Sequence, residues 1–322
     1  MHIISNPSQD EIKSAAKSLM NGHLVSFPTE TVYGLGADAA NEKAVNRIYV
    51  AKGRPKNHPV IVHISSPDQL ENWAREIPEF AIKLGSAYWP GPMTLILKRN
   101  SRALDFVTGG QESVGLRVPN QQVALLLLRE FEKLGGFGIA APSANRFGSI
   151  SPTTAEAVEE ELAKFLESQD LILDDGQCEI GVESSIIDCT QVNPVVLRPG
   201  AITKEMVEKV TGLTVSLKDD ESEIKAPGLL ASHYAPKANV ILGLTAKPGD
   251  GFIALDQIPT PIGSIRLASP ISVEDYARDL YKAFRMADQF GLNNIYVVEP
   301  EGHGLAIAIR DRLHKASAGN RS

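Results

Sequence analysis

Four cationic side chains lie at the predicted ends of helices or strands, the places where α/β enzymes usually bind ligands. Lys52 and Arg54 are separated by a single residue at the end of a predicted helix, and Arg117 and Arg198 lie in or at the end of short apolar segments. Arginine suits phosphate because its planar guanidinium makes paired hydrogen bonds to two oxygens. Few acidic residues lie near these cations in the sequence, so the pattern favours a site for a polyphosphate.

Each of these side chains also has a simpler interpretation. Lys52 and Arg54 could satisfy the last carbonyl groups of the predicted helix. A charge within an apolar strand, such as that of Arg117, is costly unless it is paired, so either a carboxylate partner or an anionic ligand is implied. His63 ends another apolar segment, a position more typical of a buried core or edge residue than of a functional one.

Short polar side chains in three loops supply groups for binding a small polar substrate. Residues 27–36 (FPTETVYGLG) combine hydroxyl groups, an acid and glycines, although turn-forming residues alone would also explain this composition. After the apolar segment 138–141, Ser143 and Asn145 supply a hydroxyl and an amide among small residues that let a ligand approach the backbone. Residues 181–188 (GVESSIID) add two further hydroxyl groups. These loops predict hydrogen bonds to a polar ligand beside the cations.

Several common catalytic motifs are absent from the sequence. It contains no GxxxxGK[ST] loop, no HExxH motif, no Cys/His metal cluster and no GxSxG elbow. Residues 34–39 (GLGADA) imitate the dinucleotide fingerprint, but they do not directly join a strand to a helix, so a Rossmann cofactor site is not expected. Cys178 and Cys189 are isolated from each other and are predicted to be reduced and buried.

The composition is that of a folded protein with one large domain or two moderate ones. Of the 322 residues, 43% are hydrophobic and 22% are charged, and the net charge is −7. This acidic balance disfavours nucleic-acid binding over the whole surface but leaves room for a local basic cleft. The sequence shows no signal peptide, and no apolar run approaches the roughly 18 residues that a membrane span requires. We therefore expect a cytoplasmic protein with no membrane contact.

The elements that must position these side chains follow an α/β pattern. Ser8 and Glu11 form a capping-box signature for a helix that should end near Gly22, and Gly53 should end the next helix. The other predicted elements are helices near 41–52, 120–133 and 153–164 and strands at 24–27, 60–64, 94–98, 114–118, 138–141, 171–173, 185–188 and 195–197. Several strands are continuous apolar runs, which are typical of a mixed sheet that is covered on both faces.

The C-terminal part of the chain has the pattern of a second, smaller α/β domain. The composition changes after Gly212, and the charged segment 216–226, which lacks periodicity, predicts a linker. The elements predicted beyond it are strands at 240–244, 251–255 and 295–298 and a helix at 273–290. The predicted core face of this helix consists of Tyr276, Leu280, Ala283, Ala287 and Phe290.

Eight motifs, taken together and in this order, closely resemble those of the threonylcarbamoyl-AMP synthase family. They are FPTETVYGLG (27–36), AKGRP (51–55), PVIVHI (59–64), WPGPMT (89–94), VGLRVP (114–119), APSAN (141–145), GVESSIID (181–188) and LRPG (197–200). The resemblance extends over residues 8–212, and APGLLASHYAP (226–236) is similar to the linker of the two-domain form. It implies an α/β fold with a YrdC-like twisted mixed-sheet domain at 1–212, a linker at 213–237, and a smaller Rossmann-like α/β domain at 238–322.

The resemblance implies a nucleotidyltransferase that condenses L-threonine, bicarbonate and ATP into threonylcarbamoyl-adenylate and releases pyrophosphate. A downstream threonylcarbamoyl transferase complex then carries the group to an adenosine of tRNA, and a weak contact of this chain with tRNA is compatible with that role. Mg²⁺ is the expected cofactor. It would be bound through the ATP phosphates, with no protein side chain as a metal ligand.

The resemblance also implies which residues bind the substrates. The Lys-x-Arg and Ser-x-Asn tetrad of the family, expected to be catalytic, falls on Lys52, Arg54, Ser143 and Asn145. The threonine-binding positions fall on Thr31, His63, Arg117, Ala141 and Ser184. The ATP-binding positions fall on Arg54, His58, Ser113, Ser143, Ser151, Arg198 and His233.

These assignments suggest a mechanism in which the chain brings two anions together. We expect Arg117 to pair with the threonine carboxylate and Lys52 and Arg54 to hold the carbamate and the phosphates. Arg198 and His233 would contact the nucleotide from other sides. Such chemistry relies on positioning and charge stabilisation rather than on protein nucleophiles. The segment around His233 could close over the site as a lid that excludes water, or could be a plain tether between the domains.

Two other functions fit parts of the sequence. Hydrogenase-maturation proteins that form a carbamoyl-adenylate use a similar catalytic domain, but they add zinc fingers, which two cysteines cannot supply. An RNA-binding or ribosome-assembly role would need a basic concave face, which the acidic total charge does not favour. Turnover of ATP with bicarbonate and threonine, compared with carbamoyl phosphate and with RNA alone, separates the three functions.

Overall fold

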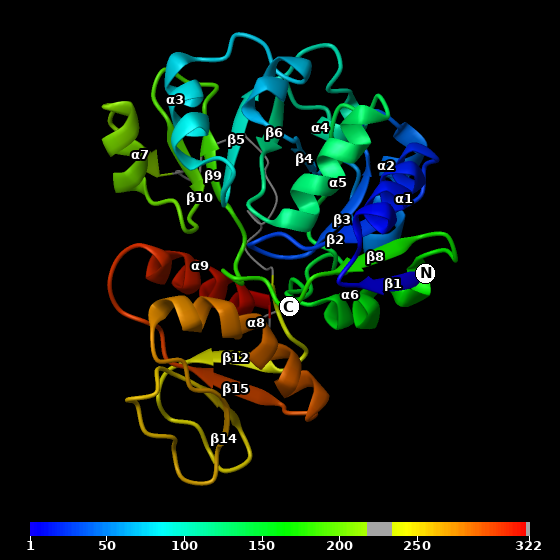
Figure 1. Cartoon of the computed structure of the whole chain (residues 1–322). Coiled ribbons are helices and arrows are strands. Elements are labelled where there is room, and N and C mark those ends of the chain that lie inside the picture. The colour runs from blue at the N-terminus through cyan, green and yellow to red at the C-terminus, as the bar shows by residue number, and fades with distance from the viewer. Residues whose placement is uncertain (218–233, 320–322) are drawn as a thin grey trace.

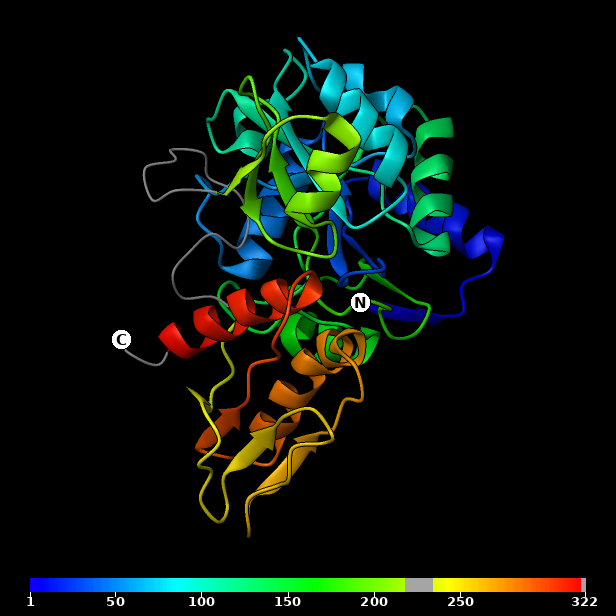
Figure 2. The same ribbon diagram turned by 90° about the vertical axis from the view of Figure 1, so that its left-hand side faces the viewer.

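The computed structural model describes residues 1–217 and 234–319, and their strands form two separate sheets (Figure 1). We refer to residues 1–217 as the N-terminal domain and to residues 234–319 as the C-terminal domain. The helices α8 (Val273–Gln289) and α9 (Leu305–Ala318) lie between the smaller sheet and the N-terminal domain (Figure 1, Figure 2). The C-terminal domain thus contacts the N-terminal domain through these helices and through its first residues, Tyr234 and Ala235, rather than through its sheet.

The larger sheet is mixed and has eleven strands within the described residues. In spatial order these are β1 (His2–Ser5), β8 (Leu171–Asp174), β2 (Val25–Phe27), β3 (Gly34–Asp38), β7 (Ile139–Ala140), β4 (Ile61–His63), β6 (Ser113–Arg117), β5 (Met93–Lys98), β9 (Ser185–Asp188), β10 (Val195–Arg198) and β11 (Ser216–Leu217). β4 runs parallel to β6, whereas β7 and β5, on either side of this pair, run antiparallel to them. The predicted mixed sheet is confirmed.

Helices cover both faces of this sheet, which explains the continuous apolar strands. Ile139 and Leu173 pack against one group of helices, while their neighbours Ala140 and Ile172 belong to the apolar cluster of the other face. The first face is covered by α1 (Gln9–Met20) and α5 (Gln122–Lys133). The other helices of the domain are α2 (Glu42–Lys52), α3 (Glu79–Tyr88), α4 (Asp105–Thr108), α6 (Ala155–Leu162) and α7 (Lys204–Thr211), with 3₁₀ turns at Pro67–Asn72 and Ala163–Phe165.

Two capping signals predicted from the sequence are present: one begins α1 and the other ends α2. The N–H of Glu11 donates to the Ser8 hydroxyl at 3.4 Å, and the N–H of Ser8 donates to the Glu11 carboxylate at 2.8 Å, so the capping box is confirmed. Gly53 ends α2 in the left-handed conformation, with a φ of 62°. The chain therefore turns sharply between Lys52, the last residue of α2, and Arg54.

The C-terminal domain is built on a parallel sheet of four described strands. Their order is β12 (Asn239–Leu242), β15 (Asn294–Val297), β13 (Gly251–Ile253) and β14 (Ile265–Ala268). Together with α8 and α9, this sheet confirms the predicted smaller Rossmann-like α/β domain. The predicted core face of α8 is buried at Tyr276, Leu280, Ala283 and Ala287. It is wrong for Phe290, which is 57% exposed because α8 ends one residue earlier and the buried stripe ends with it.

Two strands, β3 and β11 (Ser216–Leu217), form in segments that were predicted to be a loop and a linker. Residues 34–39 are not a dinucleotide loop: β3 covers Gly34–Asp38, and a Cβ at Gly36 would lie 2.8 Å from the Phe27 ring and from the Val25 carbonyl oxygen. This glycine therefore serves a close approach of strands. Ser216 and Leu217, within the predicted linker, still pair with β10 as β11. Residues 218–233, which include the rest of the charged segment and also His233, lie outside the described residues.

Two further predictions from composition can be compared with the structure. Cys178 and Cys189 are buried and are not joined in a disulfide, as predicted. In the part of the chain that the structure describes, no helix combines the length and apolar character needed to cross a bilayer.

Candidate active site

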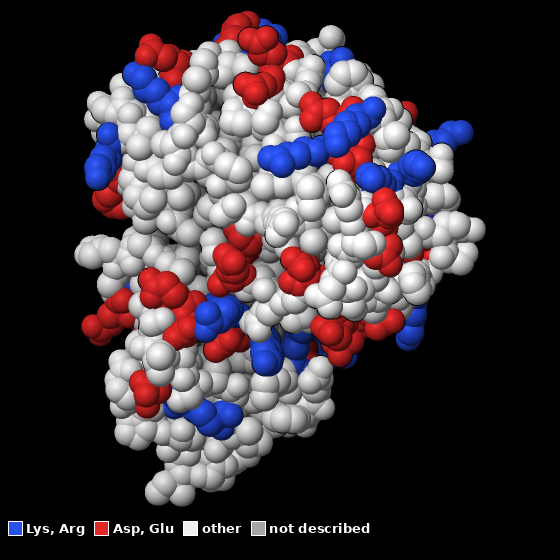
Figure 3. Space-filling model, in the orientation of Figure 1, with Lys and Arg blue, Asp and Glu red and all other residues white. Residues whose placement is uncertain are grey.

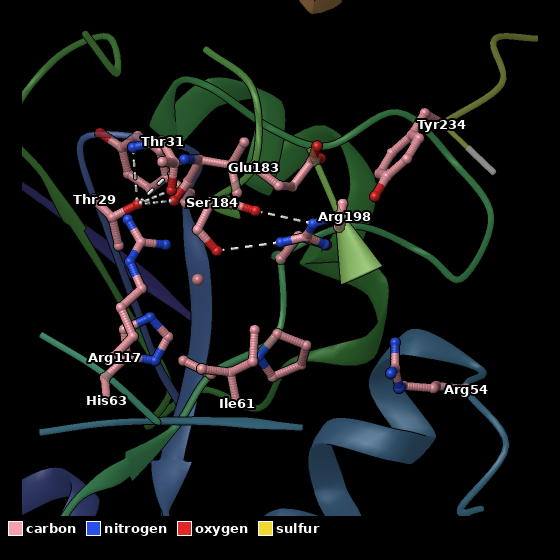
Figure 4. A pocket seen from close by; sticks show the side chains of 16 residues that line it. Thr29, Thr31, Arg54, Ile61, His63, Arg117, Glu183, Ser184, Arg198 and Tyr234 are labelled. Carbon is pink, nitrogen blue, oxygen red and sulfur yellow. Dashed lines mark hydrogen bonds between the residues drawn. The ribbon is translucent and has the colours of Figure 1, made fainter. Parts of the chain in front are cut away.

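One cavity brings together all five residues that the family resemblance assigned to threonine (Figure 4). Thr31, His63, Arg117, Ala141 and Ser184 all line it, and all of these except Ala141 are labelled in Figure 4. They come from the ends of β4 and β6 and from the loops beside β2, β7 and β9. The parallel register of β4 and β6 places His63 directly opposite Arg117. Residues far apart in the sequence thus meet where the strands of the larger sheet end.

Arg117 has a carboxylate partner, which answers one question left open by the sequence. Its Nη2 lies 2.7 Å from Oε2 of Glu30, and the two side chains are 5% and 2% exposed. The contact is an ion pair without hydrogen-bond alignment, and the buried Nε and Nη2 of Arg117 make no hydrogen bond to the described residues. Likewise, neither carboxylate oxygen of Glu30 accepts a hydrogen bond from the described residues. The pair therefore keeps hydrogen-bonding capacity for a polar ligand.

His63 is both a buried residue and a lining residue of the cavity. Its ring packs edge-on against Phe27, with 5.9 Å between the centroids, and its Nδ1 has no hydrogen-bond partner among the described residues. Burial, followed by the nearby charge of Arg117, lowers the pKa of His63 to about 3. The imidazole is therefore neutral near pH 7, and it can offer one donor and one acceptor.

The loop that contains Thr31 is held by its own hydroxyl groups. The Oγ1 of Thr29 accepts the N–H of Thr31 at 3.1 Å and donates to the carbonyl of Val32 at 2.7 Å. It also lies 2.8 Å from Oγ1 of Thr31. Residues 27–36 thus contain a turn, as their composition suggested, and this turn fixes Thr31 at the cavity wall (Figure 4).

Arg198 and Ser184 form a second polar wall of the cavity. Arg198, at the end of β10, donates from Nε to the carbonyl oxygen of Ser184 at 3.0 Å and from Nη2 to its Oγ at 3.2 Å (Figure 4). The hydroxyl groups of Thr94 and Ser184 lie 2.8 Å apart. Arg198 is only 3% exposed. Because it donates to Ser184, Arg198, which was assigned to ATP, holds Ser184, which was assigned to threonine.

The Lys-x-Arg and Ser-x-Asn motifs interlock, but only half of their residues reach the cavity. Arg54 and Ser143 line it, whereas Lys52 and Asn145 do not. Lys52 is 2% exposed, and its Nζ donates to the carbonyl oxygens of Ser143 and Asn145 at 2.6 and 2.5 Å. Asn145 in turn donates to the carbonyl of Ser149 at 2.8 Å. Lys52 and Asn145 therefore hold the loop that presents Ser143.

Arg54 is fixed at the cavity edge by backbone acceptors. It donates from Nη2 to the carbonyl of Pro59 at 2.7 Å and from Nε to that of His58 at 3.3 Å. Its guanidinium lies over the ring of Phe147, 5.6 Å from the centroid. Burial lowers its pKa to about 10, which still leaves it protonated near pH 7.

Four of the positions assigned to ATP are not among the lining residues of this cavity. The His58 ring lies edge-on to Phe147, and Ser151 donates to Glu183 at 2.6 Å behind the cavity wall. Ser113 begins β6 and lines a separate surface hollow, about 13 Å along the strand from Arg117 but on the same face of the sheet. His233 lies outside the described residues.

Known proteins resemble this chain over nearly its whole length. A domain model of the Sua5, YciO and YrdC proteins, described as "Telomere recombination", matches residues 17–200, and one described as "Threonylcarbamoyl-AMP synthase, C-terminal domain" matches residues 202–318. The threonylcarbamoyl-AMP synthase of Pyrococcus abyssi is 41% identical, with 95% of this chain and 94% of that protein covered. The chain belongs to the threonylcarbamoyl-AMP synthase family.

A second relative and a solved structure support the match along the whole chain. The Bacillus subtilis threonylcarbamoyl-AMP synthase is 38% identical, with 96% of this chain and 93% of that protein covered. The crystal structure of P. abyssi Sua5 complexed with L-threonine superposes with a TM-score of 0.87 at 38% identity, covering 99% of this chain and 98% of that one. Both domains therefore have counterparts in the family.

Three residues at or beside the cavity were missed by reasoning from the sequence. Glu30 and Glu183 stand within the quoted motifs, and the rule that a buried arginine needs a carboxylate could have singled out Glu30 as the partner of Arg117. Tyr234 could not be found in this way. It is 1% exposed, has a φ of 64° and lines the cavity from the C-terminal domain (Figure 4). Its ring stacks on that of Tyr281 at 6.0 Å.

Replacement of Lys52 by methionine is expected to lower the free energy of unfolding by about 1–3 kcal/mol, because the carbonyls of Ser143 and Asn145 lose a buried donor. Urea unfolding followed by circular dichroism measures this change. Lys43→Met, at an exposed position of the same helix, is the matched control and should leave stability within about 0.5 kcal/mol of the wild type. Equal stabilities for the two variants would show that the Lys52 contacts do not hold the loop.

Proposed function

We propose that this chain is a threonylcarbamoyl-AMP synthase that joins L-threonine, bicarbonate and ATP into threonylcarbamoyl-adenylate and releases pyrophosphate. The observation that carries the proposal is the shared cavity: the five threonine-assigned residues line it together with Arg54, Ser143 and Arg198. One bound intermediate could therefore contact both the amino-acid site and the cationic groups suited to phosphate.

The end of the cavity at Arg117 suits a zwitterionic amino acid. The Arg117 guanidinium would pair with the threonine carboxylate, and Glu30 behind it would keep the site close to neutral when no ligand is bound. Neutral His63 and the hydroxyl groups of Thr31 and Ser184 offer short hydrogen bonds to the threonine hydroxyl and amine. The buried setting strengthens each of these contacts relative to water.

The reaction then requires two bonds to form. The threonine amine attacks bicarbonate, and loss of water gives a carbamate. A carbamate oxygen next attacks the α-phosphorus of ATP, the bond from that phosphorus to the bridging oxygen breaks, and pyrophosphate leaves. Arg54 and Arg198, both buried at the cavity wall, would stabilise the charge that gathers on the phosphoryl oxygens.

Lys52 takes a different part in this mechanism from the one its motif suggested. Its ammonium contacts Ser143 and Asn145 rather than the cavity, so we assign it a positioning role. Ser143 would then contact the nucleotide at a place that Lys52 fixes. His58 and Ser113 would meet more distant parts of the nucleotide if it extends along β6, because Ser113 lies on the same sheet face as Arg117.

Mg²⁺ would accompany the triphosphate and neutralise part of its charge. Within residues 1–217 and 234–319, no group of three or more His, Cys, Asp or Glu side chains could hold a metal ion. Glu183, an acid that lines the cavity, already accepts four hydrogen bonds from protein side chains. The ligands of the ion would therefore be phosphate oxygens and water, the arrangement that Mg²⁺ commonly adopts with nucleotides.

We further propose that the product passes to a threonylcarbamoyl transferase complex acting on tRNA. The mixture of charge signs on the face seen in Figure 3 lacks the basic stripe of a dedicated RNA-binding surface. This face supports at most a weak contact with tRNA. An adenylate is a reactive mixed anhydride, so the transferase complex must bind it before it is hydrolysed by water.

The segment at 233–236 remains our candidate for a lid. Tyr234 lines the cavity and supports the idea, whereas His233 is not among the described residues. Removing everything after residue 212 would be an ambiguous test, because α8 and α9 also contact the cavity loops. A point variant, Tyr234→Ala, in the full chain is the sharper test. Faster hydrolysis of the adenylate is expected if the segment excludes water, and an unchanged intermediate lifetime would leave only a tether.

The proposed function is tested by measuring pyrophosphate release and the nucleotide product by mass spectrometry. Release is expected with ATP, bicarbonate and L-threonine together, and it should fall to background when threonine or bicarbonate is omitted. Activity with carbamoyl phosphate in place of these two would favour the hydrogenase-maturation chemistry. Stimulation by RNA alone, without threonine, would favour the RNA-binding alternative. Either result without threonylcarbamoyl-adenylate would overturn the proposal.

A further inference from the structure

The loop of residues 181–184, which we call the 181–184 loop, lies directly against the C-terminal domain. A Cβ at Gly181, where φ is 80°, would lie 2.4 Å from Cα of Arg278 in α8, so glycine alone allows this approach. Val182 is fully buried in the apolar cluster formed mainly by the C-terminal domain. The loop therefore belongs to the packing of both domains.

The carboxylate of Glu183 is held mainly by side chains of the C-terminal domain. Arg312 of α9 donates from Nε to its Oε2 at 2.9 Å, and Tyr281 of α8 donates to the two oxygens at 3.1 and 3.0 Å. Burial alone would raise the pKa of Glu183, but Arg312, Arg198 and the hydrogen bond from Ser151 outweigh it and lower that pKa to about 2. Glu183 is thus a buried carboxylate that depends on its partners.

Arg312 reaches both chain segments that carry the second polar wall of the cavity. Besides the Glu183 carboxylate, its Nη2 donates to the backbone oxygen of Glu183 at 3.2 Å, and its Nη1 donates to that of Pro199 at 2.8 Å. Glu183 directly precedes Ser184, and Pro199 directly follows Arg198. Arg312 itself is 0% exposed and does not line the cavity.

We propose that Arg312 is a positioning residue for the reaction: from the C-terminal domain, it fixes the 181–184 loop through Glu183 and the end of β10 through Pro199. These contacts hold Ser184 and Arg198 within hydrogen-bonding distance of each other, so that Ser184 can contact threonine and Arg198 can contact the nucleotide. The inference rests on the proposed function for its kinetic readout. It gives the C-terminal domain a role in building the cavity, separate from any role of the segment at 233–236.

The physical cause lies in the cost of an uncompensated charge. Without Arg312, the Glu183 carboxylate would keep hydroxyl donors but lose the cation that contacts it directly. A buried carboxylate in that state is unstable, so the 181–184 loop would move to let water reach it. Ser184 would move with the loop and leave the Arg198 guanidinium.

The test compares Arg312→Met with Arg310→Met in the full chain. Arg310 lies two residues earlier in α9 and also donates to two carbonyl oxygens, those of Pro300 and Gly302 at 2.7 and 2.9 Å, but it contacts no cavity segment. Arg312→Met is expected to raise the KM for L-threonine by about tenfold or more, because it removes one partner of a buried charge pair. Arg310→Met should leave that KM unchanged.

A second measurement does not depend on turnover. Hydrogen–deuterium exchange of a peptide spanning residues 181–189 should be about tenfold faster in Arg312→Met than in the wild type or in Arg310→Met, because exchange reports local opening. The double variant Arg312→Met/Glu183→Gln removes both charges of the buried pair and should recover slow exchange and most of the threonine affinity. If Arg312→Met does not fold, Arg312→Lys, with fewer donors, should give the same changes in weaker form.

The outcomes separate the two proposals. Wild-type exchange and a wild-type KM in Arg312→Met would overturn the positioning role, and so would equal effects of Arg310→Met. If the wild-type chain itself shows no threonine-dependent release of pyrophosphate, the proposed function fails. The exchange experiment would then still decide whether Arg312 fixes the 181–184 loop.

Discussion

Arg54→Ala is expected to slow threonine-dependent pyrophosphate release by about 10³-fold while the protein stays folded, since an arginine that stabilises phosphoryl transfer has effects of this order. The side chain lies at the cavity wall, fixed by the carbonyls of Pro59 and His58. It has no carboxylate partner among the described residues, so its removal leaves no buried charge behind. The expected loss is therefore one of transition-state stabilisation rather than of structure.

The matched control for this variant is Arg102→Ala. Arg102 also lies over a phenylalanine ring, that of Phe137 at 3.6 Å, and donates to a backbone carbonyl at 3.1 Å, but it does not line the cavity. Single-turnover kinetics with saturating threonine and ATP should show wild-type rates for Arg102→Ala. Turnover of Arg54→Ala within a few-fold of the wild type would remove Arg54 from the mechanism.

Arg117→Met is expected to have two large effects with one cause. Binding of L-threonine should weaken by about 100-fold or more, because the carboxylate loses a buried charged partner. The free energy of unfolding should fall by about 3–5 kcal/mol, because Glu30 is left charged and buried. Calorimetric titration and urea unfolding measure the two quantities separately.

The double variant Arg117→Met/Glu30→Gln distinguishes these effects. Neutral glutamine no longer needs the cation, so much of the lost stability should return. Binding of L-threonine should stay weak, because the carboxylate still has no cationic partner at the end of β6. Normal threonine affinity in this double variant would show that the amino acid binds elsewhere.

The sequence predicted best those features that depend on neighbouring residues. The helix that begins after Ser8 and the one that ends at Gly53 follow from side-chain caps and a left-handed glycine, which act within one turn. The strands at the cavity were visible as continuous apolar runs. β3 was not, because its two glycines resemble a loop until Phe27 and Ile139 are seen to leave no room for side chains.

The direction of a side chain was harder to predict than its presence at the site. Lys52 and Arg54 are two residues apart, yet one contacts the Ser143 loop and the other the cavity, because Gly53 reverses the chain between them. Arg312 was not predictable at all. Its partner Glu183 is 129 residues away, and a charged residue in a helix is normally exposed.

The contact between Arg312 and Glu183 also limits how this protein can be recombined with its relatives. A chimera that takes everything after residue 233 from another parent would inherit the 181–184 loop from one parent and α9 from the other. Should the incoming helix carry an apolar residue at the Arg312 position, the chimera would assemble around an orphaned carboxylate. Neither domain alone is therefore an exchangeable unit, and a functional chimera must take the 181–184 loop and α9 from the same parent.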